Sequence, residues 1–164
     1  MTQSISQPKE QELLRQLVGE WSVGIDMKTP DGKVVAGCGE MTAIEIAGTG
    51  INSEINAHIE GYEDYFENDL WSFDRATGKV HLFSVTSEGE SHDHVGNWVN
   101  EKTLELLWSG LYGDLDVQEQ ITAVWVSKDQ IELKETIYKQ GKPPLVTNYV
   151  FKRHELSSKD QAKL

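Results

Sequence analysis

Apolar and polar residues alternate along most of this chain, in short stretches separated by turn-forming residues, and no other feature constrains the fold as strongly. The stretches run from Trp21 to His154 and are rich in Val, Ile, Thr, Trp and Tyr. A period of two is typical of β-strands that bury one face, because successive side chains of a strand point to opposite sides of the sheet. The spacing of the turns predicts about ten strands.

The turns between these stretches contain residues that tolerate positive φ or fix φ near a turn value. Connections this short make neighbouring strands antiparallel, since a parallel pair needs a crossover of about a dozen residues. Closing such a meander on itself leaves no exposed edge. We therefore predict an all-β fold, a single antiparallel up-and-down β-barrel, with turns at 29–33, 47–50, 74–79, 87–90, 100–102, 127–129 and 140–144 and a looser connection at 61–64.

Helical periodicity occurs near the start of the chain. Pro8 suits the first turn of a helix, acidic residues follow it, and four aliphatic residues fall on one face before Gly19. We expect one domain over residues 1–164, made of a helix at 8–18, a barrel at 19–154 and a flexible tail at 155–164.

Acidic residues outnumber basic ones, with 27 Asp plus Glu against 15 Lys plus Arg and a formal net charge of -12. A surface of this charge repels nucleic acid and anionic bilayers. The sequence shows neither a signal peptide nor a run of about eighteen apolar residues. Cys38 has no partner for an internal disulfide, and we expect a small, partly buried side chain in a reducing compartment. These features predict a cytoplasmic protein without nucleic-acid or membrane partners.

The segment Leu17-Val18-Gly19-Glu20-Trp21, at the start of the first expected strand, resembles the G-x-W opening of the calycins, which include the lipocalins and the fatty-acid-binding proteins. With the Asp-x-x-Thr-Gly turn at 74–78, the chain looks most like uncharacterised bacterial lipocalin-like families of the DUF1579 type. The resemblance implies a barrel and no activity. It also implies that the Trp21 indole closes one end of the barrel after Gly19, with Arg153 stacked across it.

Other calycin groups match less well. Fatty-acid-binding proteins carry a helical lid where this chain has only the turn at 29–33, and their Arg-x-Tyr pair is Thr147-Asn148-Tyr149 here. The haem-binding nitrobindins have a similar opening, but the glycine-rich repeat that follows it is poorly reproduced. We expect no cofactor.

The segment 91–98 carries the sharpest chemical feature of the sequence. His92 and His94 lie two apart, so on a strand they point to one side and could hold a divalent metal. A two-residue turn at 88–89 would place His81 on the same face as a third ligand, whereas a loop one residue longer would place it on the other face. The alternative interpretation is that all three are exposed or hydrogen-bonded strand histidines.

Two carboxylates share the parity of apolar neighbours along their strands. Glu119 alternates with Val117 and Ile121, and Glu135 alternates with Leu133 and Ile137. If this parity faces inward, the barrel contains buried carboxylates, whose pKa values burial would raise unless a cation or hydrogen-bond donors meet them, and which would mark a site. Alternatively, these positions lie near the rim, or the apolar stripe faces a partner.

Aromatic residues in the second half of the chain could line a cavity, as in many small-molecule sites. We predict a barrel of unknown specificity that binds a small hydrophobic or amphipathic molecule. One alternative is an enzyme that uses the histidines and an interior carboxylate, although no catalytic motif demands one. Another is a filled barrel that pairs with a second copy through exposed aromatics. The candidate ligand-binding residues are His92, His94, Trp98, Trp108, Glu119 and Tyr149.

Overall fold

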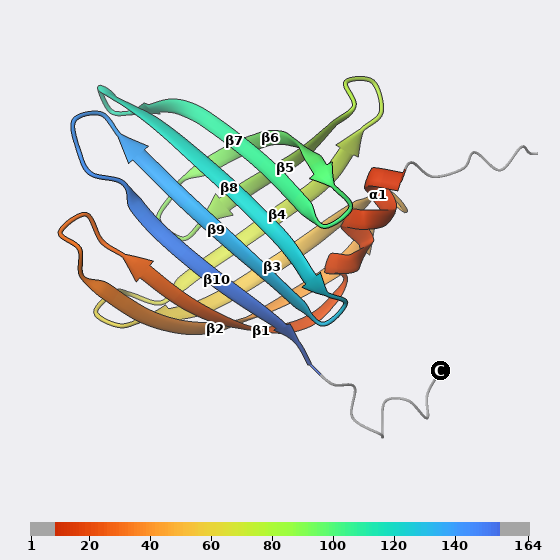
Figure 1. The fold of residues 1–164 in the computed structure, drawn as a ribbon, viewed down its shortest axis with the longest axis horizontal. Coiled ribbons are helices and arrows are strands. Elements are labelled where there is room, and N and C mark those ends of the chain that lie inside the picture. The colour runs from red at the N-terminus through yellow and green to blue at the C-terminus, as the bar shows by residue number, and fades with distance from the viewer. Residues whose placement is uncertain (1–8, 155–164) are drawn as a thin grey trace, which may run out of the picture.

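The structure, a computed structural model, describes residues 9–154, and their strands close into one barrel (Figure 1). Strands adjacent in the chain pair with each other, and β1 also pairs with β10. Every pairing is antiparallel. The predicted fold class and strand number are therefore confirmed. The strands are β1 Gly19–Lys28, β2 Val34–Ile46, β3 Gly50–Ile59, β4 Tyr65–Asp74, β5 Lys79–Thr86, β6 Ser91–Asn100, β7 Thr103–Tyr112, β8 Leu115–Ser127, β9 Gln130–Lys139 and β10 Leu145–Arg153.

Alternate residues of each strand point into the barrel. In β1, Trp21, Val23 and Ile25 are buried while the residues between them are exposed. In β8, Val117 and Ile121 are buried in the same alternating way, with Glu119 between them. Burying one such large apolar side chain contributes about 1.5–3 kcal/mol, so the inward parity holds the barrel together.

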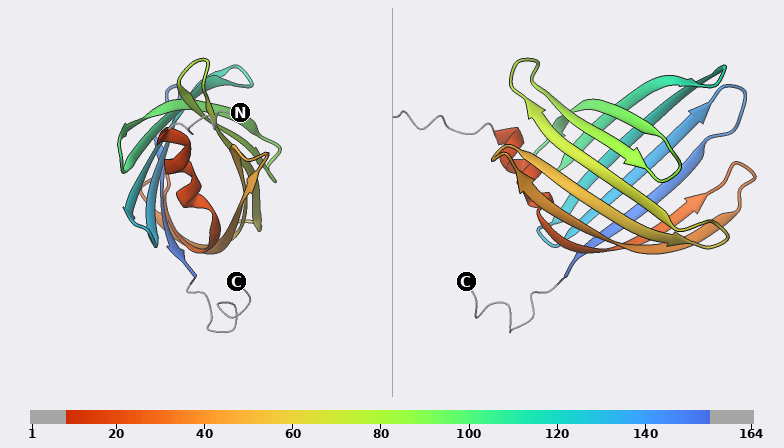
Figure 2. Two further views of the ribbon diagram at one scale, coloured as in Figure 1. Left: turned by 90° about the vertical axis from the view of Figure 1, so that its right-hand side faces the viewer. Right: turned by 180° about the vertical axis from the view of Figure 1, so that it is seen from behind.

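A short helical segment lies across one end of the barrel (Figure 2). The α-helix α1 spans Lys9–Leu14 and a single 3₁₀ turn, η1, spans Arg15–Leu17. This helix is shorter than the expected 8–18, because Val18 already has extended backbone angles and the last turn has tightened. Neither helix in residues 9–154 is long and apolar enough to cross a membrane. The predicted first helical residue Pro8 and the predicted tail at 155–164 lie outside the described residues.

The residues expected to close the barrel meet beside this helix. The Arg153 guanidinium lies 4.0 Å from the centroid of the Trp21 ring and donates hydrogen bonds to the carbonyls of Val18 at 2.6 Å and Gln16 at 2.7 Å. Gly19 has φ of +137°, and a Cβ there would come within 2.3 Å of Arg153 Nη1. The absence of a side chain at Gly19 thus lets the guanidinium reach both carbonyls.

The β5–β6 hairpin has the longer of the two loops considered from the sequence. The amide of Thr86 donates to the carbonyl of Glu90, which leaves a three-residue turn with Gly89 at φ +83°. His81 consequently pairs with Val95 and not with Gly96, and it lies on the outer face, 3.1 Å from Asp93. His81 as a third metal candidate beside the other two histidines is therefore wrong.

Cys38 is exposed, so its expected partial burial is also wrong. It lies on the outward parity of β2, between the inward-facing Val35 and Met41. No residue in the described range 9–154 buries this small side chain on the outer face.

Candidate functional site

The barrel is hollow toward the end opposite the helix. A cavity of about 370 Å³ is lined there by residues of the turns at 29–33, 60–64 and 87–90 and by the strands below them. A smaller hollow of about 50 Å³ adjoins it on the helix side and includes Leu17 in its lining. Glu67, Ile121 and Glu135 border both spaces. The larger space thus lies among the turns at one end of the barrel, while the helix lies across the other end (Figure 2).

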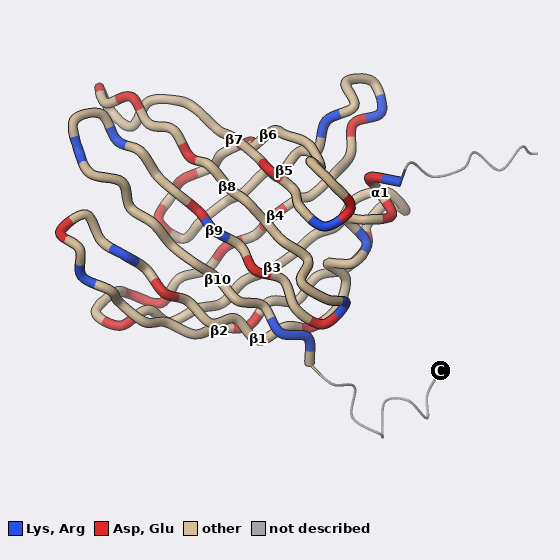
Figure 3. The backbone as a smooth tube through the Cα atoms, viewed as in Figure 1, with Lys and Arg blue, Asp and Glu red and all other residues tan. Residues whose placement is uncertain are grey.

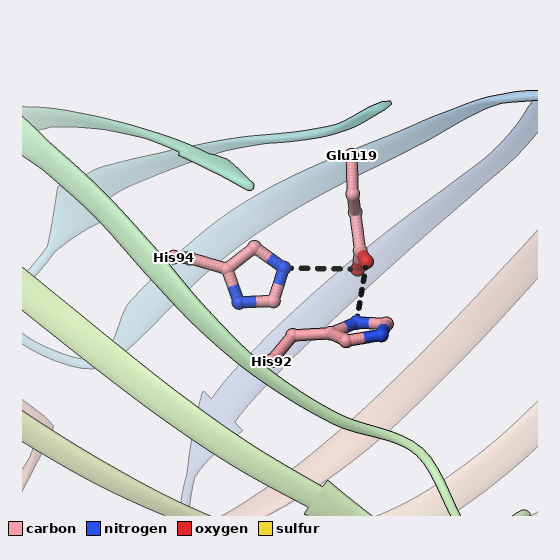
Figure 4. Close-up of side chains that lie close together, drawn as sticks. All are labelled: His92, His94 and Glu119. Atoms are coloured by element: carbon pink, nitrogen blue, oxygen red, sulfur yellow. Dashed lines mark hydrogen bonds and ion pairs between the residues drawn. The ribbon is translucent and has the colours of Figure 1, made fainter. Parts of the chain in front are cut away.

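Two histidines and one carboxylate meet in the wall of this cavity (Figure 4). His92 Nδ1 lies 3.1 Å from Glu119 Oε2, and His94 Nε2 lies 3.3 Å from Glu119 Oε1. The histidines come from β6 and the glutamate from β8, with β7 between them. His94 and Glu119 are buried, with only 2% and 7% of their surface exposed. One potential ligand atom from each residue lies within 4.8 Å of the other two, so this trio could hold a metal ion.

A second carboxylate, from β9, supports the first. Burial by itself would raise the pKa of Glu119, but a hydrogen bond with Glu135 and the neighbouring His94 and His92 outweigh it and bring the pKa to about 2. The pKa of Glu135 is instead raised well above its usual value by burial and by the nearby Glu119. Glu135 also accepts a hydrogen bond of 3.0 Å from the Tyr149 hydroxyl. These opposite shifts favour the ionised form of Glu119 and the protonated form of Glu135.

Strand β4 contributes two further inward carboxylates. Asp69, 3% exposed, accepts hydrogen bonds from Ser84 at 2.6 Å and from Ser53 at 3.2 Å. Glu67 accepts one from the Tyr65 hydroxyl at 3.0 Å. Burial is the largest cause that raises the pKa of Asp69 and of Glu67, and each carboxylate is also close to another carboxylate. The sequence interpretation missed this pair.

The aromatic residues predicted to bind ligand do not all reach the cavity. Trp108 stacks on the His92 ring, with centroids 3.7 Å apart and planes at 14°, and so fixes the orientation of that imidazole. Tyr149 lines both hollows. Neither Trp108 nor Trp98 lines either hollow, and Trp98 packs away from the histidines, against Trp125, with ring centroids 4.6 Å apart. The structure thus brings together five of the six candidates, all but Trp98.

The cavity lining is acidic. Within residues 9–154, no Lys or Arg lines it, whereas most basic side chains of the barrel lie near turns and strand ends (Figure 3). Such an enclosed acidic wall favours neutral or positively charged guests over anions. The acidic residues of the lining are Glu63, Glu67, Glu88, Glu90, Glu119 and Glu135.

Several solved structures share this fold. Rv2717c from M. tuberculosis matches with a TM-score of 0.68 at 17% identity, over 92% of this chain and 100% of that chain. The S-type phycobiliprotein lyase CPES from Guillardia theta matches with a TM-score of 0.64 at 12% identity, over 89% and 93% of the two chains. A redesigned β-barrel, mFAP0, bound to DFHBI, matches with a TM-score of 0.50 at 12% identity, over 84% and 99%.

These likenesses show a shared β-barrel fold and nothing finer, because the identities are low. No family profile and no curated protein matches the sequence. A place among the bacterial DUF1579-type families stays a prediction.

Proposed function

We propose that the barrel binds a small, partly apolar molecule, neutral or positively charged, in the cavity beside His92 and His94. The observation that carries this proposal is the cavity itself, because apolar walls that include Ile55, Ile121 and Ile137 meet a convergent polar group on one side. Small-molecule sites commonly have this composition. A filled barrel, the structural alternative, would need a solid interior, and the cavity of about 370 Å³ argues against one.

The solved barrels of the same fold support ligand binding in general terms. One is a phycobiliprotein lyase and another is a designed barrel with DFHBI bound. For this chain we propose that the polar end of the guest reaches the ionised Glu119 and the Tyr149 hydroxyl, while its apolar part lies against the isoleucines. A cytoplasmic location and pairing of two copies remain predictions of the sequence.

The test uses Nile red, a neutral apolar dye, and anilinonaphthalene sulfonate, an anionic one, both with EDTA present. We expect Nile red fluorescence to rise on binding and the anionic dye to bind more weakly. Ile137→Trp places an indole in the cavity and should weaken Nile red binding by about tenfold or more, equivalent to about 1.4 kcal/mol.

The matched control is Tyr138→Trp, since the neighbouring Tyr138 faces outward and is 42% exposed. This variant should bind the dye as the unmodified protein does. Equal binding by both variants would place the dye on the outer surface and contradict the proposal.

A further inference from the structure

His94 is a buried polar side chain without a hydrogen bond. It is 2% exposed, and within residues 9–154 neither Nδ1 nor Nε2 of its ring has a hydrogen-bond partner. Its Nε2 lies 3.3 Å from Glu119 Oε1, but this contact lacks the direction of a hydrogen bond. Buried polar groups in native proteins nearly always have hydrogen-bond partners, so His94, which meets Glu119 only as an ion pair, is a candidate ligand for a group that both residues could bind.

The spacing of the donor atoms suits a small cation. Two ligand atoms bonded to one tetrahedral Zn²⁺ at about 2.0–2.2 Å lie about 3.4 Å from each other. The distances from Glu119 to His92 Nδ1 and to His94 Nε2 are 3.1 and 3.3 Å. Each histidine thus lies at about such a separation from one of the two Glu119 oxygens, and one ligand atom from each of the three residues lies within 4.8 Å of the other two.

We propose that His92, His94 and Glu119 bind one divalent transition-metal ion, Zn²⁺ or an ion of similar chemistry. Two imidazole nitrogens and one carboxylate oxygen form a donor set that Zn²⁺ accepts in sites with three protein ligands. Mg²⁺ and Ca²⁺ fit less well, because both prefer ligand sets made of oxygen.

The neighbouring residues hold these ligands as the outer shell of a metal site does. Glu135 hydrogen-bonds to Glu119 and in turn accepts from Tyr149, and Trp108 stacks flat on His92. Ligating carboxylates and imidazoles in proteins are commonly oriented by such outer contacts. Glutamates at the rim, together with a net charge of -12, would draw a cation into the cavity.

The proposed metal gives the cavity a specific chemistry. Three protein ligands leave at least one coordination position on Zn²⁺, and all three ligands line the cavity. A guest with an oxygen or nitrogen donor could then bind the ion directly. The site goes beyond the proposed small-molecule binding and does not depend on it, because the ion would bind when no organic guest is present.

The experiment is a calorimetric titration of the full chain, stripped with EDTA and then freed of it, with Zn²⁺ alone. Co²⁺ absorption in the visible range reports the coordination geometry. We expect one Zn²⁺ per chain. His92→Ala, His94→Ala and Glu119→Gln should each weaken binding by about 100-fold or more, and Glu135→Gln by about tenfold, as outer-shell changes do.

His81→Ala is the matched control, because His81 belongs to the same hairpin but lies on the outer face against Asp93. It should bind Zn²⁺ with unchanged affinity. Circular dichroism checks the fold of each variant, and His92→Ala, whose side chain is only partly buried, decides the question if His94→Ala does not fold.

The proposal is overturned if no one-to-one binding is seen, or if the His92 and Glu119 variants bind as tightly as the His81 control. The trio would then be an ion-pair network that orders the cavity wall. Because the dye experiment contains EDTA, its result is independent of this one.

Discussion

At the scale of single residues, Arg153 joins the last strand to the segment before the first strand through contacts that only a guanidinium can make together. It stacks on Trp21 and donates to two carbonyls of the segment before β1, and to the carbonyl of Lys128 at 3.1 Å. A lysine ammonium is a compact point charge and cannot span these partners. The length of the side chain matters less here than its planar fork.

We therefore expect Arg153→Lys to lower the free energy of unfolding by about 2 kcal/mol, since hydrogen bonds to a charged donor contribute about 1.5–3 kcal/mol before their partial exposure is considered. Urea unfolding followed by tryptophan fluorescence measures this. Lys152→Gln, at an exposed neighbour, should stay within about 0.5 kcal/mol of the unmodified protein. Equal effects of the two changes would mean that Arg153 acts only through its charge.

Gly110 has a similar role for the site. A Cβ at Gly110 would lie 2.4 Å from Trp108 Cζ2, so the indole occupies the space that a side chain would need. Gly110→Ala should push Trp108 away from His92, lower stability by about 1–3 kcal/mol and change the near-ultraviolet circular dichroism. Ser109→Ala, at the exposed neighbour, should leave that spectrum unchanged. An unaltered spectrum in Gly110→Ala would contradict the close packing.

At the scale of elements, β4 shows why part of the site escaped prediction. Tyr65 and Trp71 share one parity with Glu67 and Asp69, while Phe66 and Leu70 share the other. Both faces of β4 thus mix apolar and polar residues, so hydrophobicity does not decide between them, and Phe66 and Leu70 are 51% and 40% exposed. Burying the carboxylates is unfavourable by itself, so the packing and hydrogen bonds of the whole sheet must outweigh it.

The buried carboxylate Asp69 predicts a pH dependence of stability. Its pKa in the folded protein is raised well above 3.8, so the folded state binds more protons than the unfolded state between these two values. The free energy of unfolding should consequently fall as pH rises from about 4 through the raised pKa, and the contribution of Asp69 is most favourable below about pH 4.

The substitution Asp69→Asn removes the contribution of this one carboxylate to the pH dependence of stability. Denaturant unfolding at about pH 5 and about pH 8 should show that the variant loses less stability than the unmodified protein on going to the higher pH. The free energy of unfolding of the variant should still fall somewhat with rising pH, because the pKa values of Glu67 and Glu135 are also raised by burial. Parallel profiles for the two proteins would mean that Asp69 keeps its ordinary pKa.

The connection between β7 and β8 was missed for a different reason. The two-residue turn at Gly113-Asp114 is a strong hairpin signal, with Gly113 at φ +61°. The turn lies between Tyr112 and Leu115. The alternation of apolar and polar residues in the sequence runs on through this turn, so nothing in the pattern marks the boundary between the two strands. The turns that were predicted do connect consecutive strands, because their Gly, Pro, Asn and Asp residues interrupt the alternation.

At the scale of the whole molecule, the barrel could be predicted from the sequence because closure follows from many short antiparallel connections. The position of Glu119 beside the histidines could not be predicted, because it depends on register across three strands. A one-residue change in the β5–β6 loop would have brought His81 inward instead. Glu119 and Glu135 share the parity of apolar neighbours in their strands, which indicated that they could face inward. The structure places both carboxylates at the cavity.

The pairing of β1 with β10 has a consequence for how this chain assembles. The other pairings in the cylinder join strands that follow one another in the chain, so each can form as a local hairpin. The β1–β10 seam joins residues as far apart as Ser22 and Lys152, 130 positions away, and must bear the loop-closure entropy of nearly the whole chain. Arg153 and Trp21 lie at one end of this seam, so their contacts stabilise the strand pairing that has the highest loop-closure entropy.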